Sequence, residues 1–187
     1  MKPTGDVFDS VWRAACAVEP VGRHEVALMI EEGHYLKKWP AIPTLILGLR
    51  CYDTLLGVIV FAQPPLETNT RYGGPTWELA RLWCSRDLPK NAETFIIGRA
   101  VRYIKRTHPL VKFLVSYADP SVGHSWLIYR AANWKPDGST DDGRNTPRFD
   151  YKCAVSGRSY SRRAHVPEGV EIVKVARVSK LRFYYAL

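Results

Sequence analysis

Residues 111–134 bring together, in one short run, the residue types best suited to chemistry: VKFLVSYADPSVGHSWLIYRAANW. The β-branched and aromatic residues of 111–117 predict a buried strand, which ends in a turn beginning at Asp119. A helical pattern follows, with Ser121 as its N-cap. A strand that leads into a helix N-terminus gathers Ser116, Asp119 and exposed backbone amides at one edge of a sheet, where ligands often bind. A capped turn with no catalytic role is the equally simple alternative.

Asp119 is the candidate general base at this edge. A carboxylate at a strand end is only partly solvated, which raises its pKa towards a range useful for proton abstraction. The alternative is that Asp119 only caps the turn together with Ser121. Tyr129 is expected two turns into the helix, where its hydroxyl can reach back to protonate a leaving group. Core packing with one hydrogen bond is the usual role of a tyrosine in that position.

His34 and Tyr35 form a second candidate pair, near the end of a helix predicted over residues 21–37. They place an ionisable ring beside a stacking ring, as a pocket for an extruded nucleobase requires. A His-Tyr pair is also common at helix ends without any such role. With Ser116, the candidate catalytic residues are Asp119, Tyr129, His34 and Tyr35. No two of the five histidines lie four residues apart and the cysteines form no C-x-x-C pair, so we expect no metal site.

The charge of the chain points to a polyanionic partner. Lys and Arg number 27 against 18 Asp and Glu, which gives a net charge of +9 and a pI near 9.5. Residues 144–163 hold six basic residues, interleaved with aromatic rings, against the single carboxylate of Asp150. We therefore expect residues 135–165 to form a basic, mobile segment that contacts DNA, through Lys152, Arg158, Tyr160, Arg162 and Arg163. A solubilising surface is the alternative.

These candidates need a scaffold, and a chain of 187 residues with 46% hydrophobic content is long enough for one buried core. We expect a single domain over residues 1–187. Apolar patterns predict strands at 44–52, 55–61, 76–84, 111–117, 148–155, 170–178 and 181–185. Helices are predicted at 91–107 with Asn91 as cap and from Ser121, and residues 21–37 are predicted to form one amphipathic helix or a pair of short helices. Polar loops are expected at 64–75 and 135–147. This order predicts an α/β fold, a mixed sheet flanked by helices on both faces.

The remaining composition suggests an intracellular setting. No apolar run approaches the roughly 20 residues that cross a bilayer, and the first residues, MKPTGDVFDSVW, lack the apolar centre of a signal peptide. We expect no membrane partner and a location in the cytoplasm. The four cysteines, Cys16, Cys51, Cys84 and Cys153, lie far apart, and we interpret them as reduced core thiols.

The order of elements resembles the GNAT acyltransferase fold, and two segments are more specific. WELARLWCSRDLPKNAETFIIGRAVRYIK, and LVSYADPSVGH with the trailing IYRAANW, resemble the Mom family of DNA-modifying proteins from Mu-like phages. The resemblance runs from about Gly33 to Tyr151. It implies conversion of the N6 group of adenine in double-stranded DNA to a carbamoylmethyl (acetamido) form, which shields phage DNA from restriction in the cytoplasm of the infected bacterium.

Residue by residue, the resemblance implies functional roles for a set of positions spread along the chain. These are His34, Tyr35, Arg81, Thr94, Asp119 and Tyr129, with Tyr52 as a weaker match. The reaction gives one of these roles a physical reason. The adenine amino group is a poor nucleophile because its lone pair is delocalised into the ring, so a base must remove its proton as the new bond forms.

The expected donor site departs from that of ordinary GNAT enzymes. Those enzymes hold the pyrophosphate of coenzyme A on an R/Q-x-x-G-x-G/A loop, whose glycines let backbone amides approach the phosphates. Residues 85–92 here, SRDLPKNA, lack both glycines. The predicted donor-binding residues are Arg81, Arg86, Lys90, Asn91 and Thr94. The missing glycines argue against acetyl-CoA as the donor. The donor is therefore unknown, and an aminoacyl-tRNA is one alternative to another acyl donor.

Three functions are compatible with this sequence. The first is a transferase that modifies DNA adenine. The second is a GNAT N-acetyltransferase for a protein or small-molecule amine, against which the missing glycines count. The third is a phage DNA-binding protein without catalysis. The sequence leaves open a homodimer, a helper protein and the DNA context that is recognised.

Overall fold

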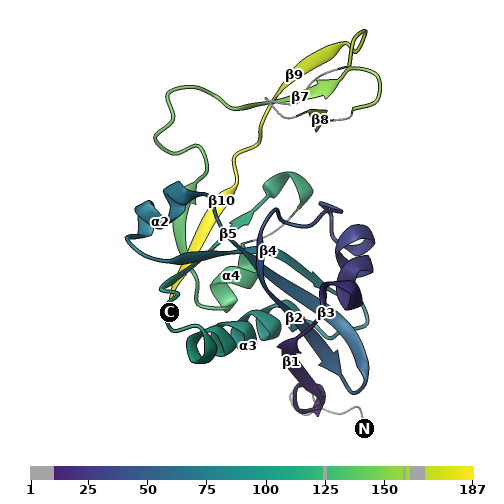
Figure 1. Ribbon diagram of the computed structural model, residues 1–187, viewed down its shortest axis with the longest axis vertical. Coiled ribbons are helices and arrows are strands. Elements are labelled where there is room, and N and C mark those ends of the chain that lie inside the picture. Colours follow the sequence, from purple (N-terminus) through teal and green to yellow (C-terminus); the bar gives the residue numbers. More distant parts are fainter. Residues whose placement is uncertain (1–10, 124–125, 158, 161–166) are drawn as a thin grey trace.

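The computed structural model describes residues 11–123, 126–157, 159–160 and 167–187. Its main body is a seven-stranded sheet (Figure 1) with the strand order β1-β2-β3-β4-β5-β10-β6. The strands are β1 (Cys16–Pro20), β2 (Pro43–Cys51), β3 (Thr54–Ala62), β4 (Thr76–Cys84), β5 (Phe113–Ala118), β6 (Lys135–Ser139) and β10 (Leu181–Ala186). Neighbours run antiparallel except β4 and β5, which are parallel, so the sheet is mixed.

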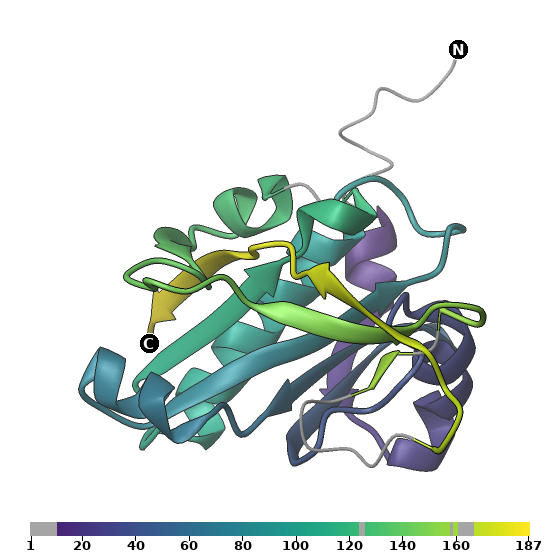
Figure 2. The same ribbon diagram turned by 90° about the horizontal axis from the view of Figure 1, so that it is seen from above.

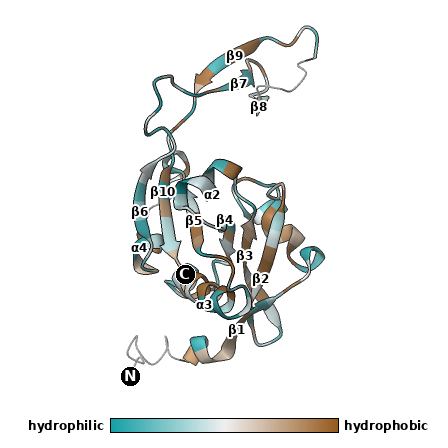
Figure 3. Ribbon diagram, turned by 60° about the vertical axis from the view of Figure 1, so that its left-hand side comes forward, coloured by the Kyte–Doolittle hydropathy of each residue, from teal (hydrophilic) through white to brown (hydrophobic). Residues whose placement is uncertain are grey.

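Short and long helices cover both faces of this sheet. They are η1 (Arg23–Val26), η2 (Met29–Gly33), α2 (Leu66–Tyr72), α3 (Ala92–Thr107), η3 (Pro120–Val122) and α4 (Leu127–Ala131). Alternation along β2 and β3 explains the two faces. Ile59 and Phe61 join the cluster under α3, whereas Val58 and Val60 join a second cluster with Val26 of η1. In Figure 3 the hydrophobic colour follows β2 and β3, next to the β1 edge of the sheet.

The helix α3 anchors the larger cluster because its apolar residues recur at helical spacing. Ile96, Ile97, Ala100 and Ile104 are fully buried against the sheet. This is the helix predicted over residues 91–107. Asn91 does occupy the N-cap position, yet its backbone is left-handed (φ 72°) and its side chain makes no capping hydrogen bond. Asn91 therefore stands at the predicted cap position, but its side chain does not cap the helix.

The two parallel strands in the middle of the sheet share only a short ladder. β4 and β5 pair over Thr76–Phe113, Trp77–Leu114 and Glu78–Val115. Beyond that point β4 continues to pair with β3 as far as Cys84. After the last backbone pair, a side-chain hydrogen bond connects the two strands: Ser116 Oγ of β5 donates to the carbonyl oxygen of Leu79 of β4 at 2.9 Å. The sheet thus opens between β4 and β5.

A second, smaller sheet projects from one end of the main sheet (Figure 1). It consists of β7 (Phe149–Cys153), β8 (Ser159–Tyr160) and β9 (Ile172–Ala176), in the order β8-β7-β9. Figure 2, turned by 90°, shows this projecting sheet above the ends of the main strands. Two irregular segments, residues 140–148 and 177–180, run side by side and connect the main sheet to the projecting sheet; we call them the neck. Arg177 N donates to Arg148 O across the neck at 2.9 Å.

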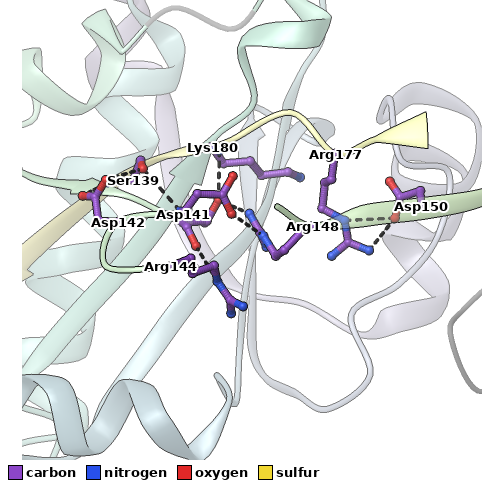
Figure 4. Close-up of polar contacts among 9 residues, drawn as sticks. Ser139, Asp141, Asp142, Arg144, Arg148, Asp150, Arg177 and Lys180 are labelled. Carbon is purple, nitrogen blue, oxygen red and sulfur yellow. Dashed lines mark hydrogen bonds and ion pairs between the residues drawn. The ribbon is translucent and has the colours of Figure 1, made fainter. Parts of the chain in front are cut away.

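Charged pairs fasten the neck (Figure 4). Arg148 pairs with Asp141 and also donates to the hydroxyl of Thr140. Arg177 donates to Asp150 of β7, through Nε at 2.9 Å. The bonds of Arg148 lie within the segment 140–148, and the bond of Arg177 joins the second segment to β7, so polar side chains hold both segments of the neck in place.

Several expectations about elements are corrected. The strand β1 lies before the first predicted element, and the predicted loop 64–75 contains the helix α2. The loop 135–147 begins with the edge strand β6, which pairs with β10. Ser121 does not begin a continuous helix: Asp119 caps the short η3, and α4 begins only at Leu127.

The cysteine interpretation is wrong for two of the four thiols. Cys16 and Cys51 face each other across β1 and β2 and form a disulfide. Cys84 and Cys153 are free thiols: Cys84 packs against the larger apolar cluster, as predicted, whereas Cys153 lies on the projecting sheet outside both clusters, so it is not a core thiol. Among the helices that the structure describes, none is long and apolar enough to cross a membrane.

Candidate active site

The opening between β4 and β5 contains two adjoining hollows. The inner hollow, of about 370 Å³, is lined by His34, Trp83, Ser116 and Tyr129 among others. The outer hollow, of about 520 Å³, is lined mainly by charged side chains. Both hollows share Tyr35, Leu79, Ala80 and Tyr117 in their walls, so they form one cleft. The sheet provides this cleft because its ladder ends after Glu78.

Ser116 and Tyr129 form a fixed hydroxyl pair at the bottom of the inner hollow. Their oxygens lie 2.9 Å apart, and both side chains are buried. Ser116 has one hydroxyl proton, which it donates to the carbonyl of Leu79, so Tyr129 must be the donor towards Ser116. Burial raises the pKa of Tyr129, although the bond with Ser116 opposes that shift. Tyr129 therefore holds its proton at neutral pH and can act as a donor.

His34 and Tyr35 enter the cleft from the end of η2. Their rings lie 4.6 Å apart, with His34 buried and Tyr35 partly exposed. The Nδ1 atom of His34 accepts the amide proton of Leu36 at 3.1 Å, so the proton of the neutral ring resides on Nε2. Gly33 permits this entry, because a Cβ there would meet the Trp83 indole nitrogen at 2.5 Å. Burial raises the pKa of Tyr35.

Arg81 lies buried at the boundary of the cleft. Its Nε donates to the carbonyl of Lys38 at 2.8 Å and its Nη1 to the carbonyl of Ala80 at 2.6 Å. Burial lowers the pKa of Arg81, but a guanidinium stays charged in proteins. These two bonds fix the direction of the side chain, so Arg81 contributes an oriented positive charge beside Tyr35.

Asp119 departs from the expectation that its pKa is raised. Its carboxylate accepts from Ser121 N at 3.0 Å and Ser121 Oγ at 2.5 Å, and pairs with Lys180 at 3.0 Å. Burial alone would raise the pKa of Asp119, but the bonds from Ser121 and Lys180 outweigh burial and hold the pKa below its ordinary value. Asp119 is thus ionised and engaged, and it places Lys180 at the wall of the outer hollow.

Glu78 is the residue that sequence reasoning missed. It lines the outer hollow at the last rung of the β4–β5 ladder. Burial raises the pKa of Glu78 in spite of the nearby charges of Arg81 and Lys180. Within the described part of the chain, no hydrogen bond or ion pair engages its carboxylate. A glutamate inside a strand that is otherwise mostly apolar was the available signal.

The outer hollow is strongly cationic. Its basic lining residues are Arg71, Arg81, Arg144, Arg148, Lys180 and Arg182. Three carboxylates, Glu67, Glu78 and Asp142, share the same walls. The excess of positive charge suits a phosphate-bearing ligand. Four of these basic residues come from the neck or from β10, which explains why the order of the sequence did not group them with Arg81.

The other predicted donor residues do not reach this cleft. Arg86, Lys90 and Asn91 are exposed in the loop before α3, and Thr94 lies in the first turn of that helix. None of the four is among the residues that line the two hollows. In the same loop, Ser85 Oγ donates to the Asp87 carboxylate at 2.8 Å. Tyr52, the weaker match, is 79% exposed at the β2–β3 turn.

Two of the five predicted DNA-contacting residues belong to the part of the chain that the structure describes. Tyr160 lies on β8 and lines a hollow of about 640 Å³ on the projecting sheet. Lys152 lies on β7 but is not among the residues lining that hollow. Arg158, Arg162 and Arg163 lie outside the described residues. Arg144 and Arg148 line both this hollow and the outer hollow of the cleft, so the two sites adjoin.

The sequence of the chain is similar to those of known proteins. The sequence model of the Mom protein family matches residues 15–185. "Methylcarbamoylase mom" of Escherichia phage Mu is 30% identical over 131 residues, which cover 65% of this chain and 53% of the phage protein. The chain therefore matches about half the length of that curated relative.

Solved structures resemble the fold at low sequence identity. An acetyltransferase of Bacillus subtilis in complex with CoA has a TM-score of 0.55 and 12% identity, covering 92% of this chain and 97% of that one. A GNAT family acetyltransferase of Elizabethkingia anophelis with acetyl-CoA bound has a TM-score of 0.55 and 9% identity, covering 92% and 99%. The predicted GNAT-like mixed α/β sheet is thereby confirmed.

Proposed function

This chain belongs to the Mom protein family, and from that premise we propose that it is a transferase acting on the N6 group of adenine in DNA. The product would be a carbamoylmethyl form of the base, which protects phage DNA from restriction in the cytoplasm of the bacterial host. The relative from phage Mu is named "Methylcarbamoylase mom", which supports the transfer of a small carbamoyl-containing group. The cationic outer hollow and the net charge of +9 support a nucleic-acid substrate.

One observation carries this proposal. Most of the predicted catalytic residues, although far apart in the sequence, meet in the cleft between β4 and β5. His34, Tyr35, Ser116 and Tyr129 line the inner hollow, and Arg81 lines the outer hollow beside Tyr35. Asp119 adjoins them through its ion pair with Lys180.

Glu78 is the proton acceptor in this proposal. The adenine amino group needs a base as the new N–C bond forms, and an acceptor works best when its pKa lies close to the working pH. Glu78 has a raised pKa and faces the outer hollow, whereas Asp119 has a lowered pKa and is engaged by Ser121 and Lys180. Asp119 then acts as a positioning residue that keeps Lys180 at the wall.

Tyr129 supplies the proton that the leaving group needs, by turning its O–H from Ser116 to that group; the Ser116 hydroxyl can then donate to the tyrosinate oxygen instead of the Leu79 carbonyl. Before this step the Tyr129 hydroxyl is held protonated by burial and is oriented by Ser116, which is itself fixed on the Leu79 carbonyl. Tyr35 and His34 present rings at the join of the two hollows, where an extruded adenine can stack. Extrusion of a base costs a few kcal/mol, and contacts between phosphates and the surrounding arginines would offset that cost.

The loop before α3 does not fit the pyrophosphate of coenzyme A. Residues 85–92 carry no glycine, and the Asp87 carboxylate is held within the loop by Ser85, where an anion would need donors. We therefore route no step through that cofactor. An aminoacyl-tRNA is the alternative donor, but direct acyl transfer from it would bond a carbonyl carbon to N6, so a rearrangement would have to follow to give the carbamoylmethyl form. Calorimetric titration with acetyl-CoA should show no saturable binding; a tight, saturable isotherm would restore acetyl-CoA as the donor.

Mass spectrometry of nucleosides tests the proposed function directly. DNA from bacteria expressing this chain should contain an adenosine derivative with the added mass of a carbamoylmethyl group, and cells with the Glu78→Gln variant should lack it. Unmodified nucleosides together with an acetylated protein or amine would favour an ordinary N-acetyltransferase. Unmodified nucleosides with retained DNA binding would favour a protein that binds DNA without catalysis.

A further inference from the structure

The projecting sheet presents aromatic and cationic side chains on one face. Tyr151 of β7 lies opposite Tyr160 of β8 and opposite Lys174 of β9. Residues directly opposite each other in an antiparallel sheet share a face, and Phe149, two residues from Tyr151, shares it as well. The ammonium group of Lys174 lies 4.2 Å from the centre of the Phe149 ring. Rings and positive charge therefore occupy one surface together.

This face borders the hollow of about 640 Å³, whose walls extend onto the neck. Arg144, Arg148 and Arg177 add three guanidinium groups to the charge of Lys174. Among the described lining residues the single carboxylate is Asp150, and it is paired with Arg177. Arg144 and Lys174 have no carboxylate partner in the described ranges. The hollow thus retains uncompensated positive charge beside its rings.

Packing of the main fold does not account for these rings. Phe149, Tyr151 and Tyr160 are half-buried, and they belong to neither of the two apolar clusters that hold the main sheet and its helices. The neck separates the projecting sheet from those clusters (Figure 1). Flat rings on a small sheet surface, surrounded by cations, are the arrangement by which proteins hold unpaired nucleotides.

We propose that this face of the projecting sheet binds an unpaired DNA segment, whose bases stack on Tyr151, Tyr160 and Phe149 and whose phosphates contact Lys174 and Arg144. Only the identity of the strand as DNA rests on the proposed function. Extruding an adenine from a duplex leaves neighbouring bases unstacked or unpaired. Because Arg144 and Arg148 line both the hollow and the cleft, a strand held on this face can continue into the cleft.

Fluorescence anisotropy with a short labelled single strand of thymidine nucleotides tests this site in the full-length chain. Tyr151→Leu keeps apolar bulk but removes the stacking ring, so it should weaken binding roughly 5- to 150-fold, the range expected for one lost base stack. Tyr151→Phe keeps the ring and should bind like the parent. The control is Val173→Ala, which changes an exposed side chain on β9. Val173 lies opposite Lys152, so it points to the other face of the same sheet.

Three outcomes would overturn the proposal. Equal losses in Tyr151→Leu and Val173→Ala would indicate a general disturbance of the sheet, and unchanged binding in Tyr151→Leu would remove stacking from the site. Preference for an RNA strand of equivalent sequence over DNA would assign the face to RNA instead. Nucleoside mass spectrometry on the unchanged chain separates this test from the proposed function: Tyr151-dependent binding without any modified adenine would leave the inference standing while the proposed activity fails.

Discussion

The cleft between β4 and β5 and the hollow of the projecting sheet are both cationic and both carry aromatic rings, but they are built differently. In the cleft, Ser116, Tyr129 and Arg81 are buried and each is held by hydrogen bonds of 2.6–2.9 Å. In the hollow, Tyr151 and Lys174 sit half-buried or exposed on short strands. Preorganised groups suit a reaction with strict geometry, whereas adaptable groups suit contacts with many sequences. We therefore assign the proposed reaction to the cleft and the proposed binding of a strand to the hollow.

The largest expected effect tests the cleft. Glu78→Gln removes the proposed proton acceptor and should lower turnover by about 10²- to 10⁴-fold while DNA affinity is kept. Quantification of the modified nucleoside in a reaction with purified protein measures this change. Glu67→Gln is the matched control, because Glu67 also lines the outer hollow but lies on α2. Equal activity of both variants would remove Glu78 from the mechanism.

Tyr129→Phe should have a smaller effect on the same measurement. Loss of the hydroxyl removes the proposed proton donor and leaves Ser116 without its second partner, so turnover should fall about 10²-fold. Ser116→Ala should reduce turnover less, because the tyrosine keeps its proton, and the double variant should resemble Tyr129→Phe alone. Strictly additive losses in the double variant would mean that the two hydroxyls act separately.

The hollow should respond in the opposite sense. Changing Lys174, which lines the hollow but not the cleft, to Gln should weaken binding to single-stranded DNA and reduce the slope of log affinity against log salt by about 0.7, the value for one lost phosphate contact. Turnover at saturating DNA should stay close to that of the parent. A fall in turnover with unchanged affinity would erase the distinction between the two regions.

The smallest effects concern stability and its dependence on pH. The pKa of Asp119 is lowered in the folded chain, so its contribution is present above its ordinary value of 3.8 and is lost as pH falls. The pKa of Glu78 is raised, so its ionised form costs stability as pH rises above the ordinary value of 4.5. At neutral pH, Asp119→Asn should destabilise by about 1–3 kcal/mol, and Glu78→Gln should stabilise slightly.

Thermal denaturation at neutral pH, at about pH 4 and at about pH 2 measures both shifts, because Glu78 becomes protonated by about pH 4 whereas Asp119 is protonated only below its ordinary value of 3.8. The two variants should move the melting temperature in opposite directions at neutral pH and converge towards the parent in acid. A shift of the same sign in both would show that Glu78 is stabilised by Arg81 and Lys180 more than it is penalised by burial.

Local patterns predicted the scaffold well because most elements are fixed by nearby residues. The strand β4 has the predicted bounds of 76 and 84, since Pro75 precedes an apolar run that ends at Ser85. The strand β6 escaped prediction because its sequence, KPDGS, has loop composition. Such a sequence can lie at the edge of a sheet, where pairing to β10 replaces intrinsic preference.

The parts of the site that sequence could not predict depend on partners distant along the chain. Asp119 received the wrong pKa direction because its two hydrogen bonds from Ser121 act together with an ion pair to Lys180, which belongs to the neck before β10. Cys16 and Cys51 were not paired because the register of β1 against β2 decides their approach. Glu78 was missed because the β4–β5 ladder ends at this residue, so that its side chain lines the cleft. The sequence does not indicate where that ladder ends.

The place where the projecting sheet joins the fold has a consequence for how such proteins diversify. Leu181 at the start of β10 lies directly opposite Ser139 at the end of β6, so the whole projection is an extended hairpin tip. A tip of that kind can be shortened, lengthened or exchanged without altering the register of any strand in the main sheet. Because Arg144, Arg148 and Lys180 of the neck also line the cleft, a replacement that leaves the cleft unchanged has to keep the neck and exchange only the small sheet beyond it.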